Sequence, residues 1–169
     1  MRSYWFIPLM VSAIALTGCG TTGKMVQSTA ADQNPVNPQV KAFSAWGDVS
    51  QTEKGLKINL AGDLLFKVGH TRLSTEGLQT IDGIAAVLAN HPGDLVNILE
   101  YTDNSGSSAG NLKLSQRRAD AIKLELVKKG IVVDYVSAVG KGDMEPVAPN
   151  DTADNRSKNR RVELDITTN

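Results

Sequence analysis

The sequence is poor in several residue types that common protein functions require. Its 169 residues include one cysteine, Cys19, so no intrachain disulfide can form and the hydrophobic core must hold the fold. Aromatic residues make up 5% of the chain, and 18 basic residues are balanced by 18 acidic ones. Binding to nucleic acid usually needs a basic excess and aromatic side chains on which bases stack. We therefore expect no nucleic acid among the partners of this protein.

Histidine is also scarce, which bears on catalysis. The chain has two histidines, His70 and His91, and His91 stands directly before a proline. The region that holds them contains no cysteine, and no group of residues has the spacing of a metal site. Since the sequence offers no nucleophile paired with a general base, we expect neither an enzyme nor a bound metal or cofactor.

The first 18 residues have the pattern of a secretory signal peptide. Arg2 is followed by an apolar run from Tyr4 to Leu16 and then by small residues. A basic start, an apolar segment of about a dozen residues and a small-residue end are typical of such signals. A membrane-spanning helix needs about 20 apolar residues, and the polar stretch after Gly20 does not extend this run. We therefore predict a signal peptide over residues 1–18 rather than an uncleaved anchor.

The position of Cys19 indicates that the cleaved chain carries a lipid. Leu16-Thr17-Gly18-Cys19 resembles the bacterial lipobox, whose cysteine is lipidated and becomes the first residue of the mature chain. The alternative is a cysteine that merely ends a signal peptide. Two or more acyl chains would hold the protein at a membrane, since each buried methylene contributes about 0.8 kcal/mol. Because Gly20 comes next, rather than the aspartate that tends to retain such lipoproteins at the inner membrane, we expect a lipid anchor in the outer membrane of a Gram-negative bacterium, with the chain facing the periplasm.

Residues 19–45 are predicted to form the lipidated cysteine and a flexible tether. The segment from Gly20 to about Ala42 is rich in Thr, Ser, Gln, Asn and Pro and has few large apolar residues. About 25 residues of this kind span roughly 28 Å as a flexible coil. The domain after the tether, residues 46–169, can therefore stand clear of the membrane that carries the anchor.

Hydrophobic periodicity predicts an α+β domain over residues 46–169. Apolar residues alternate with polar ones over Leu56–Leu60, as in a half-buried strand, and Ser74 is a cap candidate before a helix. The expected strands cover about residues 49–51, 56–60, 95–99, 132–139 and 161–166, and the expected helices cover about residues 74–90 and 108–129. The economical packing is a mixed four-stranded sheet with both helices on one face, in the order βαβαββ, preceded by the short β element at 49–51.

The core residues of this domain can be predicted from the same pattern. Because Leu95–Leu99 is strongly apolar, we expect its strand to be central and buried on both faces. On the helices, residues at helical spacing should face the sheet. The first helix contributes Leu78, Ile81, Ile84, Ala85 and Leu88, and the second contributes Leu112, Ala119, Ile122 and Leu126, with Ser115 within the stripe.

An acid and a base flank the turn after the strand at 95–99. Asp103 lies on a glycine-bearing turn, and Arg118 lies on the helix after it. Helical side chains lean toward the amino end of their helix, so Arg118 can reach back toward Asp103. Together the two side chains can bind the ammonium and the carboxylate of a zwitterion. Taken alone, Asp103 could equally be a turn former, and an arginine on a helix is more often a solvated charge.

Four short motifs carry these residues and succeed one another along the chain. Their members are Thr102, Asp103 and Gly106; Asn111, Leu114, Ser115, Arg118 and Ala119; Gly140, Gly142 and Pro146; and Asn159-Arg160-Arg161-Val162-Glu163. In this order they resemble the OmpA C-terminal-like peptidoglycan-binding domain, over about residues 49–166. The resemblance implies noncovalent binding of the peptidoglycan stem peptide through diaminopimelate, with Asp103 and Arg118 at the positions of the ligand-binding Asp and Arg of that family.

Further polar residues are candidates for the rim of this site. Thr102, Asn104 and Asn111 lie beside the acid and the base, although such residues more often cap helices or form turns. Arg160 and Arg161 could line the site or simply flank an edge strand, and Arg161 is included in the predicted site. Leu114 is expected in the core.

The sequence departs from the family pattern at two places. Many relatives have Asp or Asn shortly after the position of Phe66, where this chain has Lys67-Val68-Gly69, so any contact made there must be altered or lost. Asn155 stands where glycine is usual, and asparagine tolerates left-handed backbone geometry better than most residues.

The predicted function is that of an outer-membrane lipoprotein that binds peptidoglycan and tethers the membrane to the cell wall. The alternative is an envelope module that uses the same domain to bind a protein partner, because a fold does not fix a function.

Overall fold

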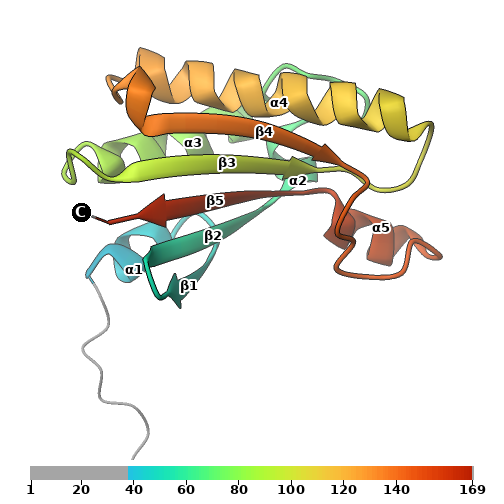
Figure 1. Cartoon of the computed structure of the whole chain (residues 1–169), viewed down its shortest axis with the longest axis horizontal. Helices are drawn as coiled ribbons and strands as arrows, with labels where there is room; N and C mark the ends of the chain where they lie inside the picture. The colour runs from blue at the N-terminus through green and yellow to red at the C-terminus, as the bar shows by residue number, and fades with distance from the viewer. Residues whose placement is uncertain (1–37, 169) are drawn as a thin grey trace, which may run out of the picture. The chain divides into compact units, whose positions relative to one another are not determined.

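The computed structural model describes residues 38–168, so the predicted signal peptide, Cys19 and most of the predicted tether lie outside the described residues. The strands are β1 (Asp48–Thr52), β2 (Gly55–Ala61), β3 (Leu95–Tyr101), β4 (Val136–Gly142) and β5 (Arg161–Thr167). They form one mixed sheet in the spatial order β1-β2-β5-β3-β4 (Figure 1). β3 and β4 are parallel, and the other neighbours are antiparallel. The element expected at 49–51 is therefore not separate from the sheet: it is the edge strand β1, and the four expected strands become five.

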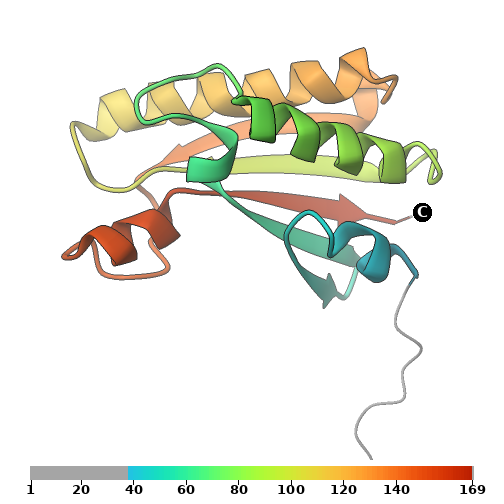
Figure 2. The ribbon, with the colours of Figure 1, turned by 180° about the vertical axis from the view of Figure 1, so that it is seen from behind.

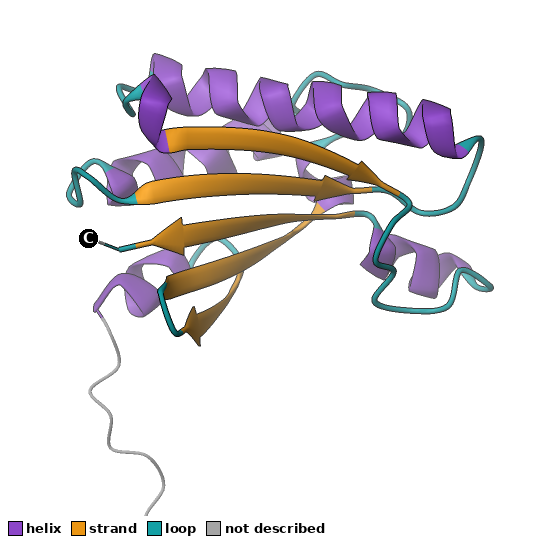
Figure 3. Cartoon of the chain, in the orientation of Figure 1, coloured by secondary structure: helices purple, strands orange, loops and turns teal. Residues whose placement is uncertain are grey.

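The expected α+β class and the placement of the long helices are confirmed. α3 (Thr75–Leu88) and α4 (Ser108–Lys128) lie on one face of the sheet (Figure 2). The shorter elements are α1 (Pro38–Phe43), α2 (Gly62–Leu65), α5 (Ala153–Asn159) and the 3-10 turn η1 (Val133–Tyr135) (Figure 3). Within residues 38–168, no helix has the length and the apolar composition needed to cross a membrane.

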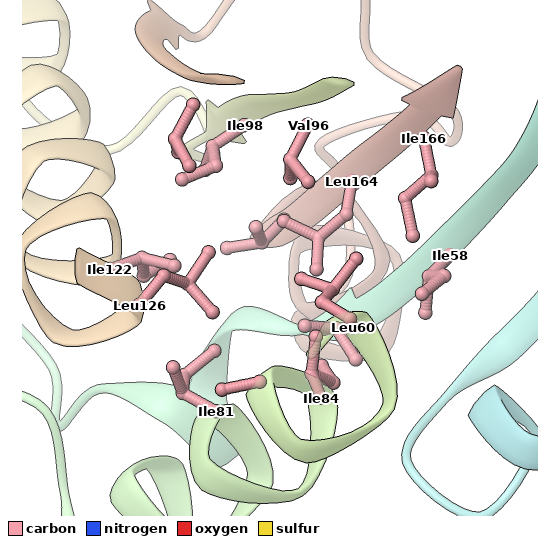
Figure 4. Close-up of a cluster of buried hydrophobic side chains, with 14 of the residues drawn as sticks. Ile58, Leu60, Ile81, Ile84, Val96, Ile98, Ile122, Leu126, Leu164 and Ile166 are labelled. Atoms are coloured by element: carbon pink, nitrogen blue, oxygen red, sulfur yellow. The ribbon is translucent and has the colours of Figure 1, made fainter. Parts of the chain in front are cut away.

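The core lies between the sheet and the two long helices (Figure 4). Alternate residues of β2, β3 and β5 meet the buried positions of α3 and α4, as the periodicity predicts. The labelled side chains are Ile58, Leu60, Val96, Ile98, Leu164 and Ile166 from the strands and Ile81, Ile84, Ile122 and Leu126 from the helices.

Three expectations about the core are wrong. Leu78 is 39% exposed, because α3 approaches the backbone of Leu65 through the neighbouring Gly77. Leu112 is 48% exposed, because Asn111 takes the inward position at that end of α4. β3 is an interior strand, between β5 and β4, but it is not buried on both faces, since Leu95 is 44% exposed on the side away from the helices.

The exposed edge of β4 is covered by side chains from α4. Ser115 Oγ accepts a hydrogen bond from the Gly142 N–H at 2.9 Å, and Gln116 Oε1 accepts one from the Gly140 N–H at 2.9 Å. These bonds satisfy edge-strand groups that would otherwise be open to pairing with another chain. β4 starts later than predicted, because residues 133–135 form the turn η1. It also ends later than predicted, at Gly142.

The folded domain starts before residue 46. α1 packs against α3 and β1, and Phe43 at its end is fully buried. Gln39 donates a hydrogen bond to Asp94 Oδ2 at 2.9 Å. The part of the predicted tether between residues 38 and 45 is therefore part of the domain, because its one large aromatic side chain adds to the core.

The long loop predicted after β4 contains α5. Asn159 at the end of this helix is fully buried, and its Oδ1 accepts hydrogen bonds from the N–H groups of Val147 and Ala148 at 2.9 and 3.0 Å. These bonds attach the loop to the residue that precedes Arg160. Asn155 lies inside α5, where its N–H bonds the capping Thr152, so no left-handed geometry is needed there.

Candidate functional site

A hollow of about 390 Å³ lies at the end of the sheet where β3 ends and α4 and β5 begin. These ends of the three elements lie at the right in Figure 1. Its walls come from the segments just after β3, on α4, between α2 and α3, and around α5. The lining residues are Val68, Gly69, Thr102, Asp103, Ser105, Asn111, Leu114, Arg118, Ala153, Arg156 and Arg160. Asp103 and Arg118, the acid and the base expected from the sequence, thus line the same hollow.

Local bonds fix the turn that carries Asp103. The Thr102 N–H donates to the Gly142 carbonyl at 2.7 Å, which extends the pairing of β3 with β4 by one residue. Asp103 Oδ1 accepts the Ser105 N–H at 2.9 Å, a turn that aspartate favours. Gly106 has a φ of 94°, which a residue with a side chain rarely adopts, and Ser107 then caps α4. The chain reverses tightly here and starts α4 beside the acid.

Asp103 is paired with Arg160, not with Arg118. Arg160 Nη1 donates to Asp103 Oδ2 at 2.6 Å, while its Nε and Nη2 donate to the two carboxylate oxygens of Asp63 at 2.7 and 2.6 Å. Burial raises the pKa of the Asp103 carboxyl, but the hydrogen bonds from Arg160 and Ser105 outweigh this and lower it below its usual value. Asp103 is therefore ionised at neutral pH. One cation between two carboxylates leaves this cluster with a net negative charge.

Arg118 is 4% exposed and holds the segment between α2 and α3. Its Nε donates to the His70 carbonyl at 2.8 Å, and its Nη2 donates to the Lys67 carbonyl at 3.2 Å. Its guanidinium carbon lies 4.9 Å from the centre of the Phe66 ring. In the segment Lys67-Val68-Gly69, where the sequence departs from the family pattern, the backbone carbonyl of Lys67 therefore contacts Arg118. Within residues 38–168, three of the five guanidinium N–H groups make hydrogen bonds, which leaves two for a ligand.

The third bond of Arg118 goes to Glu100, which was not among the candidate residues expected from the sequence. Arg118 Nη1 donates to Glu100 Oε1 at 3.1 Å, and Glu100 is fully buried on the helix side of β3. Burial raises the pKa of Glu100 to about 7, although Arg118 opposes the shift. Glu100 continues the alternation of Val96 and Ile98, so its inward position was visible in the sequence.

The predicted rim residues divide into two groups. Thr102 and Asn111 line the hollow, and Asn111 Nδ2 donates to the Asp103 carbonyl at 3.2 Å. Asn104 is exposed outside it, and its N–H donates to Asn150 Oδ1 at 3.4 Å. Arg161 points to the sheet face away from the helices, where it lies 3.7 Å over the Tyr101 ring and donates to Glu163 Oε1 at 2.8 Å. Thus Asn104 and Arg161 are not brought to the hollow.

Arg156 and Arg160 line the hollow, whereas Arg161, which was expected there, does not. Arg161 and Glu163 alternate with the buried Val162 and Leu164, which puts Arg161 on the polar face of β5. Strand periodicity therefore contained the signal that favours Arg160. Arg156 comes from α5, a helix that the sequence pattern did not predict, and donates to the Asn150 and Asp151 carbonyls. Leu114, expected in the core, lies half-buried in the hollow wall.

A larger hollow, of about 720 Å³, lies at the other end of the sheet between the β1–β2 turn and η1. Two of its charged lining residues, Lys57 and Asp165, form an ion pair at 3.4 Å, and Lys57 also bonds Glu163. We place the candidate site in the smaller hollow, because there a buried arginine keeps unused donors and an ionised acid faces the same space. Among residues 38–168, no group of three or more His, Cys, Asp or Glu side chains could hold a metal ion.

Comparison with known proteins decides the family. Residues 65–160, more than half of the chain, match the OmpA family. The chain belongs to the OmpA family. The matched region begins at the end of α2 and ends just before β5, so it contains the whole hollow lining from Val68 to Arg160.

Three known proteins show what this OmpA-family chain is similar to. It is 34% identical over 120 residues to the probable lipoprotein YiaD of Escherichia coli (strain K12), a match that covers 70% of this chain and 55% of that one. The cell wall anchor of the T6SS from Pseudomonas aeruginosa has a TM-score of 0.68 and 26% identity, covering 78% of this chain and 96% of that one. The peptidoglycan-associated lipoprotein from Burkholderia pseudomallei has a TM-score of 0.57 and 28% identity, covering 62% and 88%. The chain thus spans little more than half the length of its curated relative YiaD.

Proposed function

We propose that this OmpA-family domain binds peptidoglycan noncovalently through the diaminopimelate of the stem peptide. The observation that carries the proposal is that an ionised Asp103 and a buried Arg118 line one hollow of about 390 Å³. The names of the similar cell wall anchor and peptidoglycan-associated lipoprotein support the same ligand.

The chemistry of the two side chains suits the free end of diaminopimelate. One carbon of that end bears both an ammonium and a carboxylate. Asp103 can accept hydrogen bonds from the ammonium, and the two unused N–H groups of Arg118 can donate to the carboxylate. Asn111 and Thr102, which line the same hollow, would lie at the rim of the bound group.

Arg160 has to give up or share Asp103 when an ammonium binds. Its bonds to Asp63 use Nε and Nη2, and its bond to Asp103 uses Nη1, so Arg160 keeps a two-point partner after it leaves Asp103. The ammonium then takes the place of Arg160 on Asp103, and its positive charge balances the net negative charge of the cluster of Asp63, Asp103 and Arg160. Asp63 therefore makes the exchange easier.

Asp103→Asn is the sharpest test of this function. Asparagine keeps an oxygen for the Ser105 N–H but loses the charge that the ammonium needs. The full chain should co-sediment with purified peptidoglycan sacculi, and the variant should bind at least about tenfold more weakly, since a hydrogen bond to a charged group contributes about 1.5–3 kcal/mol.

The matched control for that experiment is Asp82→Asn. Asp82 is also an acid in an ion pair, with Lys129 at 2.9 Å, but it lies on α3 and does not line the hollow. This variant should sediment like the unchanged chain. If Asp103→Asn also sediments normally while remaining folded, the site assignment is wrong, and a protein partner becomes the better interpretation of the domain.

We further propose that a lipid on Cys19 anchors the chain in the outer membrane, so that peptidoglycan binding tethers this membrane to the cell wall. The lipobox-like sequence and the similarity to a probable lipoprotein support the anchor. Cys19→Ser should move the protein from the membrane fraction to the soluble fraction and abolish labelling by radioactive palmitate. Membrane recovery that equals that of the unchanged chain would contradict the anchor without affecting the peptidoglycan site.

A further inference from the structure

A buried carboxylate lies directly behind Arg118, and the proposed binding chemistry does not use it. Glu100 is 0% exposed, and its Oε1 accepts the bond from Arg118 Nη1 at 3.1 Å. Its Oε2 is buried and has no hydrogen-bond partner among residues 38–168. A buried ion pair is well stabilised only when both partners are fully hydrogen-bonded. The fold therefore keeps a carboxylate here that is only half satisfied.

We propose that Glu100 is a positioning residue that sets the charge which Arg118 offers to the ligand, so that the site binds more tightly when Glu100 is protonated than when it is ionised. This inference rests on the proposed function, because it requires a ligand carboxylate on Arg118.

Glu100 and the ligand carboxylate would share the one guanidinium of Arg118. When Glu100 is ionised, it neutralises Arg118, and a ligand carboxylate would be a second negative charge on the same cation. When Glu100 is protonated, its charge disappears and Arg118 can serve the ligand alone. The bonds of Arg118 to the carbonyls of His70 and Lys67 do not depend on this proton, so the guanidinium stays in place.

The surroundings of Glu100 offer no second cation within residues 38–168. On α4 the charged side chain that contacts it is Arg118, and the nearby residues Lys67 and His70 are exposed and turn backbone carbonyls to Arg118. Across the sheet, Glu100 is paired in register with Val162 of β5 and Gly140 of β4. The charged residues next to those two positions alternate to the opposite face of the sheet; they are Arg161, Glu163 and Lys141.

The direction of the pH dependence follows from the number of protons that the complex and the free protein bind. Burial holds the pKa of Glu100 at about 7 in the free protein, against the opposing effect of Arg118. A ligand carboxylate on Arg118 raises that pKa further, so the complex holds more protons than the free protein near neutral pH. Affinity therefore falls as the pH rises through about 7. If the ligand raises the pKa by about one unit, affinity at about pH 8 should be about fivefold lower than at about pH 5.5.

The experiment compares the full chain with its Glu100→Gln variant, using the soluble tripeptide L-Ala-γ-D-Glu-meso-diaminopimelate as the probe. The alanine amine of the probe is acetylated, because a peptide α-amino group has a pKa of about 8 and would itself titrate. Calorimetric titrations at about pH 5.5 and about pH 8 then leave the free diaminopimelate ammonium and the carboxylates of the probe charged. The unchanged chain should bind about fivefold more weakly at the higher pH. Glu100→Gln, which keeps the shape but not the charge, should bind at both pH values as tightly as the unchanged chain does at the lower one.

His70→Asn is the matched control, because it changes the side chain of a residue that contacts Arg118 through its backbone. The bond from Arg118 uses the backbone carbonyl of residue 70, so the variant keeps that bond and should keep the pH dependence. The inference is overturned if Glu100→Gln retains the pH slope, if its affinity stays at the weak high-pH level, or if the unchanged chain shows no slope. If one of these results is obtained but Asp103→Asn loses binding at both pH values, only the inference about Glu100 is wrong, and the proposed function is still supported.

Discussion

Arg118→Ala should lower the free energy of unfolding by about 3–5 kcal/mol, the range expected when one partner of a buried ion pair is removed. The change leaves Glu100 without its counterion and removes the donors to the carbonyls of Lys67 and His70. It also removes the packing of the guanidinium over Phe66. Urea denaturation of the full chain measures this loss, and peptidoglycan binding should be lost with it.

A double-mutant cycle separates the charge of Glu100 from the other losses. In the background of Glu100→Gln, Arg118→Ala no longer strands a carboxylate, so its effect at about pH 8 should shrink by about 1–2 kcal/mol. Arg117→Ala is the matched control, because Arg117 is the exposed neighbour on α4 and should contribute less than about 0.5 kcal/mol. If Arg118→Ala lowers the free energy of unfolding by no more than Arg117→Ala does, Arg118 does not stabilise the fold through its buried bonds.

Gly140→Ala should destabilise the domain by about 3 kcal/mol or more, at the upper end of what overpacking costs. A Cβ built on Gly140 would lie 2.2 Å from the Gln116 nitrogen and 2.6 Å from its Cα. These are backbone atoms of α4 and cannot rotate away, so the helix has to move off β4. The shift would break the bonds from the N–H groups of Gly140 and Gly142 to the α4 side chains.

The same substitution should weaken peptidoglycan binding, because Asn111 and Arg118 are carried by the helix that must move. Thermal unfolding and sacculus sedimentation of the same preparation check the two effects together. Val139→Ala, in the same strand but 39% exposed on the opposite face, should change stability by less than about 1 kcal/mol. Equal stability of Gly140→Ala and Val139→Ala would contradict the close approach of α4 to β4.

Local patterns were sufficient to predict most of the elements. The cap at Ser74 is confirmed by its bond from the Gly77 N–H at 2.8 Å, and the alternation along β2 and β5 assigns their buried faces. The error at Leu112 occurred where polar residues occupy the inward positions of a helix. Leu112 was expected in the α4 stripe because it is apolar, yet Asn111, Ser115 and Arg118 fill that stripe at the end near the hollow. A hydrophobic pattern cannot find an inward face made of polar side chains, and such faces are common at functional sites.

The sequence by itself determined that Asp103 and Arg118 stand on a turn and on the helix after it, because motif spacing and helical periodicity are local properties. Only the tertiary structure decided which partners they have. Asp103 bonds Arg160, 57 residues later in the chain, and Arg118 bonds the carbonyl of His70, 48 residues earlier. These contacts depend on the insertion of β5 between β2 and β3 and on the course of the segment between α2 and α3. The physical reason is that strand order and register arise from the packing of the whole core, which no short stretch of sequence contains.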